Sequence, residues 1–207
     1  YSLSFGANDR TLTDEEINYL GKKGRDVIKV SRRDIPYMVA LKLDGATTVS
    51  ATMLIASFAN IKIFATGGIG GVHRGAELSF DISCDLEELG KTNVAVVCAG
   101  AKAILDLPKT LEYLETKGVL VVGYKTKKLP AFYSASSDLN VDICANTPEE
   151  IAEMINVKNE LNLEGGILVT NPIPMEYEIP HEQIDKVIDK AVEEMNEKNI
   201  IGKESTP

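Results

Sequence analysis

The chain of 207 residues has a formal net charge of −9, and 44% of its residues are hydrophobic. This length supports one sizeable core. The acidic excess argues against nucleic acids and anionic membranes as partners. No apolar run reaches the roughly 18 residues of a membrane span, and none has the pattern of a signal peptide. Cys84, Cys98 and Cys144 are odd in number and lack CxxC spacing, so we expect free thiols and a cytoplasmic location.

The first predicted elements are a capped helix, a short strand and a buried helix. Thr13 and Glu16 form a capping box ahead of a helix that ends near Gly21. The run VIKV (27–30) is rich in β-branched residues, which predicts a strand. Residues 46–60 are apolar on almost all sides, so we expect the helix predicted there to be buried.

Four further strands follow along the chain. Their runs are apolar without the alternation of a half-exposed strand, as expected of strands that are buried on both faces of a sheet. The runs are IKIFATGG (61–68), NVAVVCAG (93–100), VLVVGYK (119–125) and GGILVTN (165–171). The accompanying helices are predicted at 109–117, closed by Gly118, at 147–162, opened by Thr147 and Pro148, and along a late apolar stripe of Ile184, Val187, Ile188, Ala191, Val192 and Met195.

This alternation of strands and helices predicts an α/β fold. We expect a three-layer αβα arrangement with a mostly parallel central sheet, formed by a single domain over residues 1–207. Ligands of such sheets bind beyond the carboxyl ends of the strands. The segments that follow four of the predicted strands, at 29–34, 66–68, 99–102 and 170–174, are therefore the first places to search for a site.

The segment TGGIGGVHRG (66–75) carries five glycines in nine positions. It is not a dinucleotide fingerprint, because His73 stands where the third glycine would be, and it is not a P-loop, because Ala-Glu follows Gly75. The segment is either a tight turn or a cradle whose backbone N–H groups approach a ligand, and we favour the cradle. His73 is then either structural or a polar contact that can carry a proton.

Two carboxylates follow the glycines. Asp81 and Asp85 are four residues apart and would face the same way on one helix. They could serve helix capping, with Ser83 or Asp85 as the N-cap. The alternative is a hard divalent cation, since Mg²⁺ and Mn²⁺ prefer carboxylate oxygens and water as ligands.

Lys102 follows the apolar strand 93–100, and residues 103–106 resemble the start of a helix. A lysine in the first turn of a helix opposes the helix dipole, and burial also favours the neutral amine. Lowering a lysine pKa from ~10.4 by roughly 3 units, to near 7, corresponds to about 4 kcal/mol. A neutral amine attacks carbonyl carbon, so Lys102 is either a solvated surface charge or a Schiff-base nucleophile.

A basic cluster ends the first predicted strand. Lys29, Arg32 and Arg33 are either solvated charges or a phosphate clamp that offsets the overall negative charge. Thr47 and Thr48 open the next predicted helix, whose N–H groups would add donors to a bound anion.

Motifs spread over nearly the whole chain resemble the pseudouridine-5′-phosphate glycosidase family, also called indigoidine synthase A-like. The long glycine motif and CAGAK are the most specific of them. The matching segments are VSRRDIPY, GATTVSATM, FATGGIGGVHRGAELSFDIS, TNVAVVCAGAKAILDL, LEYLETKGV, LPAFYS, LEGGILVTNPIP and IGKESTP.

The resemblance implies an enzyme that reversibly cleaves the C–C glycosidic bond of pseudouridine 5′-phosphate, which gives uracil and ribose 5-phosphate. Lys102 matches the family's nucleophile, which forms an imine with C1′ of the opened ribose, and His73 matches an active-site histidine. Asp81 matches the ligand of a divalent metal, usually Mn²⁺. The resemblance also implies a homotrimer.

The resemblance further assigns substrate contacts. Ser83, Cys84 and Asp85 match substrate-binding positions, and we count Asp85 among the catalytic candidates as well. Cys84 replaces a residue that is commonly alanine, a change that a backbone contact would survive. Lys29 matches a substrate-binding lysine, and Val49 matches a main-chain contact.

Family chains are longer than this one. They carry a proton-donating glutamate before the matching region and an active-site asparagine after it, so we expect the glycosidase domain to be incomplete at both ends here. Two alternatives therefore stay open: a non-catalytic fragment that binds phosphosugars, and an aldolase-type lyase that forms the same imine on a phosphosugar.

Overall fold

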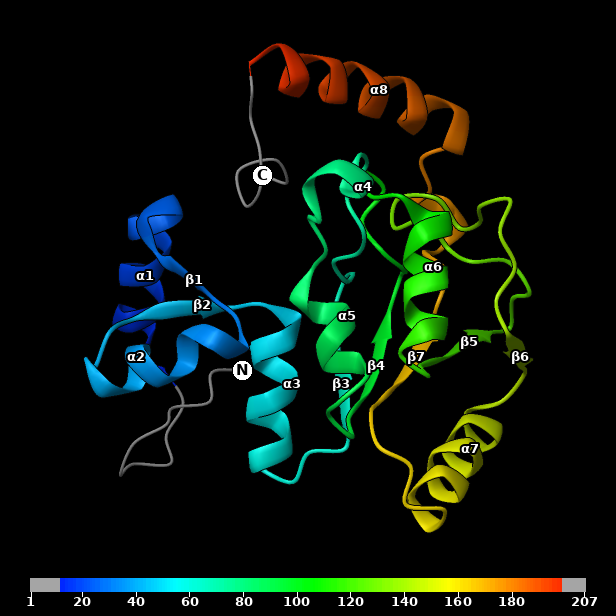
Figure 1. Ribbon diagram of the computed structural model, residues 1–207, viewed down its shortest axis with the longest axis horizontal. Helices are drawn as coiled ribbons and strands as arrows, with labels where there is room; N and C mark the ends of the chain where they lie inside the picture. Colours follow the sequence, from blue (N-terminus) through cyan, green and yellow to red (C-terminus); the bar gives the residue numbers. More distant parts are fainter. Residues whose placement is uncertain (1–11, 199–207) are drawn as a thin grey trace.

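The structure, a computed structural model, describes residues 12–198 (Figure 1). Within this range, no helix has both the length and the apolar character needed to cross a membrane. The elements in chain order are α1 (Asp14–Lys23), η1 (Gly24–Asp26), β1 (Ile28–Val30), η2 (Arg32–Asp34), α2 (Ile35–Ala40), β2 (Gly45–Thr47), α3 (Val49–Phe58), β3 (Ile63–Ala65), α4 (Ala76–Ser79), α5 (Cys84–Leu89), β4 (Ala95–Cys98), α6 (Leu107–Thr116), β5 (Leu120–Tyr124), β6 (Ile143–Ala145), α7 (Pro148–Glu160), β7 (Ile167–Thr170), η3 (Met175–Tyr177) and α8 (His181–Glu197).

Five parallel strands form the central sheet, in the order β3-β4-β7-β5-β6. The four strands predicted after residue 60 all belong to it, as β3, β4, β5 and β7. Strand β6 was not predicted, because its apolar run of Ile143, Cys144 and Ala145 is only three residues long and stands between Asp142 and Asn146. Since all five strands run the same way, their carboxyl ends share one edge of the sheet.

The strand predicted at 27–30 does not belong to the central sheet, which corrects the expectation of one sheet for all strands. Strand β1 pairs with β2 in a separate two-stranded parallel sheet, where Lys29 lies opposite Ala46. Strand β2 was predicted as the start of a helix. The helix begins later because Thr48 is its N-cap and accepts a hydrogen bond from Ala51 N–H. With α1 and α2, this small sheet forms a lobe beside α3 (Figure 1).

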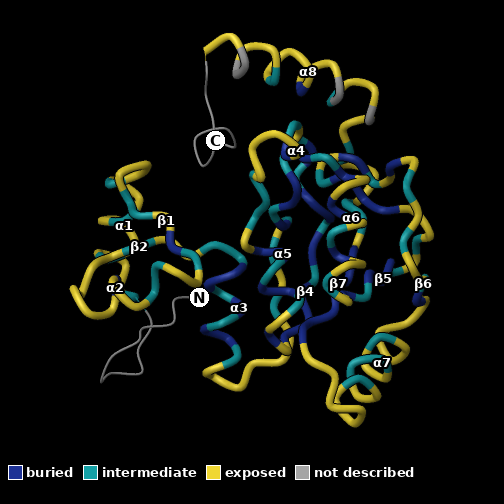
Figure 2. Tube along the Cα trace, viewed as in Figure 1, coloured by how far each residue is buried: buried dark blue, intermediate teal, exposed yellow. Residues whose placement is uncertain are grey.

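Side chains from alternate strand positions build a core on each face of the central sheet. Most residues of β4, in the middle of the molecule, have the colour of buried residues (Figure 2). On one face, Val96 and Leu168 pack with apolar side chains of α3, α5 and α6. On the other face, Val122 and Val169 pack with side chains of α7. The sheet therefore lies between two helical layers, and the predicted three-layer αβα fold is confirmed.

The predicted helices are present with shifted ends. The capping box of Thr13 and Glu16 is confirmed, although α1 continues to Lys23. Helix α6 begins before Lys109, since Asp106 is its N-cap. The apolar stripe on α8 is only partly covered, with Ile188 buried and Val187 64% exposed. The side chain of Met195 lies outside the described residues, as does the segment GKESTP (202–207).

Candidate active site

The glycine loop runs beside the segment that carries Lys102. Ile69 N–H donates to Gly100 O, and Lys102 N–H donates to Ile69 O, both at 3.1 Å. These bonds form a parallel bridge between Ile69 and Ala101, which extends the pairing of β3 with β4 beyond the sheet. Hydrogen bonds between backbone groups therefore hold the glycine loop beside the CAGAK segment (98–102), at the edge of the sheet where the carboxyl ends of the strands lie.

The loop then folds back on itself and brings His73 to Asp81. His73 N–H donates to Asp81 O at 3.0 Å, and Ser83 N–H donates to Gly71 O at 3.0 Å. His73 Nδ1 lies 3.8 Å from Asp81 Oδ2, and both side chains are partly exposed. The imidazole and the carboxylate thus form a polar pair on the antiparallel return of the loop.

Asp85 links the glycine loop to α3. Its side chain accepts hydrogen bonds from Ser50 N–H through Oδ1 and from Gly70 N–H through Oδ2, each at 2.8 Å. The residue is only 6% exposed. Both carboxylate oxygens therefore serve backbone amides, and this anchoring places Val49, the residue before Ser50, beside the loop.

Ser83 is the N-cap of α5, which confirms one of the two capping interpretations, and Asp85 lies inside the helix rather than at its cap. Ser83 Oγ accepts from Asp85 N–H at 3.3 Å. Asp81 precedes the helix, so Asp81 and Asp85 do not share a helical face. Cys84, between Ser83 and Asp85, is exposed. The predicted pair of carboxylates on one helix was wrong, because the helix starts three residues after Asp81.

Lys102 does not open a helix. It lies in the turn between β4 and α6, which begins only at Leu107, so the argument from a helix dipole was wrong. The run Ala103–Leu105 resembled a helix start because it is apolar. These residues are apolar because they pack inside the loop, where Ala103 and Leu105 are buried. Lys102 itself is half-buried.

The predicted basic cluster is divided. Arg32 forms a two-pronged ion pair with Glu88 of α5, with Nη2–Oε1 at 2.6 Å and Nε–Oε2 at 2.7 Å. Arg33 is 87% exposed and lies 3.4 Å from Asp34. Lys29 is exposed on β1. The predicted phosphate clamp of Lys29, Arg32 and Arg33 is therefore wrong in including Arg32, because the Arg32 guanidinium is paired with Glu88.

Glu88 was not singled out from the sequence, although it is 1% exposed. Burial pushes its pKa up, but the hydrogen bonds from Arg32, Thr92 and Ser50 outweigh burial and hold the pKa of this carboxyl below its ordinary value. Its neighbour Glu87 is also a glutamate but lies toward the surface. No local sequence signal distinguishes the two residues, because Arg32, the residue that pairs with Glu88, is 56 positions away in the chain.

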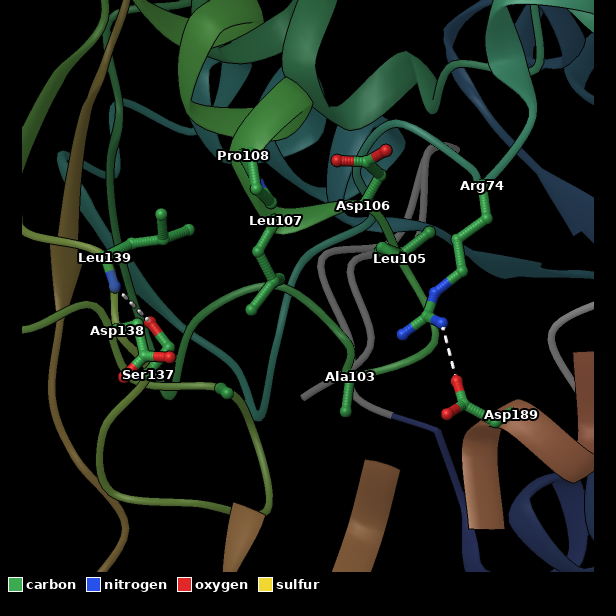
Figure 3. A pocket seen from close by; sticks show the side chains of 11 residues that line it. Arg74, Ala103, Leu105, Asp106, Leu107, Pro108, Ser137, Asp138, Leu139 and Asp189 are labelled. Atoms are coloured by element: carbon green, nitrogen blue, oxygen red, sulfur yellow. Dashed lines mark hydrogen bonds and ion pairs between the residues drawn. The ribbon is translucent and has the colours of Figure 1, made fainter. Parts of the chain in front are cut away.

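A cavity of about 620 Å³ borders the same loops (Figure 3). Arg74 reaches across it to Asp189 of α8, with Nη1–Oδ1 at 3.0 Å (Figure 3). Two residues that line the cavity, Arg74 and Ala103, directly follow His73 and Lys102 in the sequence, but no predicted site residue lines the cavity itself. The lining residues are Arg74, Ala103, Leu105, Asp106, Leu107, Pro108, Ala131, Ser137, Asp138, Leu139 and Asp189.

Comparison with known families decides what kind of protein carries this arrangement. The model of the family described as indigoidine synthase A like protein matches residues 6–207. The chain belongs to the indigoidine synthase A-like family. The glycine loop, the CAGAK segment and the α5 cap all lie inside the matched region.

Curated members of the indigoidine synthase A-like family are similar over most of this chain. A protein from Clostridium botulinum named pseudouridine-5′-phosphate glycosidase is 61% identical over 196 residues, which cover 95% of this chain and 64% of the relative. A protein of the same name from Escherichia coli is 57% identical, with 95% and 63% covered. The chain thus spans a little under two thirds of the length of these relatives.

Two solved structures have the same fold as this chain. The prealnumycin C-glycosynthase AlnA, solved in complex with ribulose 5-phosphate, has a TM-score of 0.86 and 38% identity, with 95% of this chain and 64% of that chain covered. An indigoidine synthase A-like protein from Thermotoga maritima has a TM-score of 0.80 and 37% identity, with 86% and 59% covered. The fold expected from the sequence resemblance is therefore confirmed.

Proposed function

We propose that this chain carries the sugar-binding and imine-forming part of a pseudouridine-5′-phosphate glycosidase. The observation that carries the proposal is the backbone pairing of Lys102 with Ile69, which places this half-buried residue beside the glycine loop. It occurs in a chain that is 61% identical to a protein of that name. The phosphosugar in the AlnA complex supports a sugar phosphate as the ligand class.

The proposed reaction needs an amine because a C–C glycosidic bond has no heteroatom that an acid could protonate as a leaving group. Lys102 Nζ bonds to C1′ of the sugar, and the ring oxygen leaves C1′ and takes a proton. The nitrogen lone pair then forms the C1′=N bond, while the electrons of the C1′–C5 bond move to C5 of uracil, which takes a proton. Water adds to the imine and releases ribose 5-phosphate and the free amine.

The other predicted residues would bind and orient the substrate. Four N–H groups of the glycine loop, those of Ile69, Gly70, Val72 and His73, already donate within the protein. Other N–H groups of the loop and the amine of Lys29 would hold the phosphosugar, and Val49 would contribute a main-chain contact. Ser83 and Cys84 would contact the substrate at the start of α5. Asp85 would act by holding the loop, since both of its oxygens accept backbone hydrogen bonds. His73, whose imidazole lies 3.8 Å from the Asp81 carboxylate, would be a polar contact that can carry a proton near the sugar.

A divalent cation, Mn²⁺ by family resemblance, is part of the proposal. Within residues 12–198, no group of three or more His, Cys, Asp and Glu side chains is arranged to hold a metal ion. Asp81 offers one carboxylate that is partly exposed. This donor fits a hard cation that keeps water or substrate oxygens as its other ligands. Asp81 would hold the ion, which would supply positive charge to substrate oxygens. The homotrimer remains a prediction, which light scattering can check.

The test is synthesis of the C–C bond from its two products. The chain is incubated with ribose 5-phosphate, uracil and Mn²⁺, and pseudouridine 5′-phosphate is measured by mass spectrometry. We expect product with the unmodified chain and with Lys91→Ala, a change to an exposed lysine, but not with Lys102→Ala.

Two outcomes would contradict the proposal. Binding of ribose 5-phosphate with neither pseudouridine 5′-phosphate nor an imine that borohydride can trap would instead support the non-catalytic phosphosugar-binding fragment. Cleavage of ribose 5-phosphate itself, without uracil, would support the aldolase-type lyase.

A further inference from the structure

Two buried carboxylates on α5 attach this helix to the segments around the candidate site. Asp85 binds Ser50 N–H and Gly70 N–H, as described above. Glu88, three residues later, receives both prongs of Arg32 and also the hydroxyls of Ser50 and Thr92. Its side chain is 2% exposed, whereas that of Arg32 is 47% exposed. Helix α5 is therefore the anchor, and Arg32 reaches it from outside.

Arg32 is only three residues beyond Lys29. Lys29 lies on β1 opposite Ala46, and Val30 O accepts from Thr48 N–H at 2.9 Å just before α3 begins. The strand that carries Lys29 is thus attached to α5 twice, directly by Arg32 and indirectly through β2 and Ser50.

The lobe that carries Lys29 needs such an attachment. Its elements α1, α2, β1 and β2 lie beside α3 and away from the central sheet (Figure 1). The local core of this lobe is small, because among the described residues of these four elements only Val30 and Met38 are buried, and they pack against Ala51 of α3. A small core fixes orientation weakly, whereas a bidentate Arg–carboxylate pair fixes both distance and direction.

We propose that the Arg32–Glu88 ion pair is a positioning device that sets Lys29 against the phosphosugar, an inference that rests on the proposed role of Lys29. Arg32 acts through Lys29 and does not touch the substrate. In the opposite hypothesis, Arg32 leaves Glu88 and binds the phosphate directly. The losses of affinity caused by Arg32→Lys and by Lys29→Ala would then multiply when the two substitutions are combined.

Removing Arg32 entirely would leave Glu88 charged and buried, and this can unfold the protein. Two milder variants avoid that problem. Arg32→Lys keeps the charge but cannot form the bidentate contact. The double variant Arg32→Met/Glu88→Met removes both charges and fills a similar volume, which is often tolerated by the fold.

The first measurement is affinity for ribose 5-phosphate by calorimetry. We expect Arg32→Lys, the double Met variant and Lys29→Ala each to weaken binding about tenfold. Because Arg32 acts through Lys29, combining Arg32→Lys with Lys29→Ala should weaken binding no further. The control Lys91→Ala removes the ion pair between Glu87 of α5 and Lys91, which lies just after the end of this helix. It should leave the affinity unchanged.

The second measurement is hydrogen exchange, which does not depend on the ligand. Arg32→Lys should speed exchange of peptides over 28–34 and 45–50, while peptides over 93–100 and the Lys91→Ala control stay at the wild-type rate. Unchanged exchange in Arg32→Lys, or losses of affinity that multiply in the combined variant, would overturn the positioning role. If the unmodified chain binds no ribose 5-phosphate, the proposed function fails, and the exchange rates still decide whether Arg32 orders the strand.

Discussion

Substituting Gly70 with alanine tests whether the glycine loop needs bare backbone. A Cβ at Gly70 would lie 2.1 Å from Ser83 Oγ, 2.6 Å from Ser83 Cβ and 2.9 Å from Asp85 Oδ2, whereas ordinary contacts begin at 3.4 Å. Rotating the serine hydroxyl cannot relieve the contact with its Cβ, so backbone must move. Overpacking of this kind costs about 1–3 kcal/mol.

The movement would also weaken the hydrogen bond from Gly70 N–H to Asp85, which is 2.8 Å long. A hydrogen bond to a charged group contributes about 1.5–3 kcal/mol. We therefore expect Gly70→Ala to lower the free energy of unfolding by about 2.5–6 kcal/mol, the sum of both effects.

Urea unfolding followed by far-ultraviolet circular dichroism measures this change. The matched control is Gly21→Ala, which makes the same substitution in α1, where a Cβ would meet nothing within 4 Å. We expect the control to be more stable than wild type by about 0.5–1 kcal/mol, because alanine is the better helix former. A Gly70→Ala protein that unfolds at the wild-type urea concentration would refute the packing argument.

Two further predictions concern a charge network and the metal. The pKa of Glu87 is lowered to about 2 from 4.5 by hydrogen bonds from Lys117, Tyr113 and Lys91, so its stabilising effect is present above about pH 4.5 and is lost as pH falls toward 2. Because the side chain is 34% exposed, we expect Glu87→Gln to be less stable by only about 1 kcal/mol near neutral pH, with the difference disappearing in urea titrations near pH 2; a difference independent of pH would contradict this. Asp81→Ala should abolish the activation of uracil coupling by Mn²⁺, and activation equal to wild type would reject Asp81 as the ligand.

The sequence predicted most of the fold because the signals for the central strands are local. Apolar runs without alternation placed β3, β4, β5 and β7 in one sheet. The expected burial on both faces was wrong for β3, which ends the strand order and leaves Ile63 58% exposed. Strand β2 was missed because Gly45–Thr47 lead directly into an apolar helix, and pairing with β1 decides their conformation. The pairing is a tertiary contact that helix propensity does not contain.

The sequence predicted which segments form the candidate site better than it predicted how their residues are arranged. The glycine loop and CAGAK stand out locally, and the structure places them side by side. The loop around Lys102 was mistaken for a helix, since buried loop residues and helix residues can both be apolar. The engagement of Arg32 by Glu88 was also missed, because a long-range ion pair leaves no periodic pattern in either segment.

The most direct measurement for the whole account is borohydride trapping with ribose 5-phosphate. Reduction of an imine leaves the sugar phosphate covalently attached to the lysine that formed it, and peptide mass spectrometry identifies that lysine. We predict one modified position, Lys102, with labelling lost in Lys102→Arg and retained in Lys91→Ala. No labelling, or labelling spread over exposed lysines to the same extent in Lys102→Arg, would contradict the account.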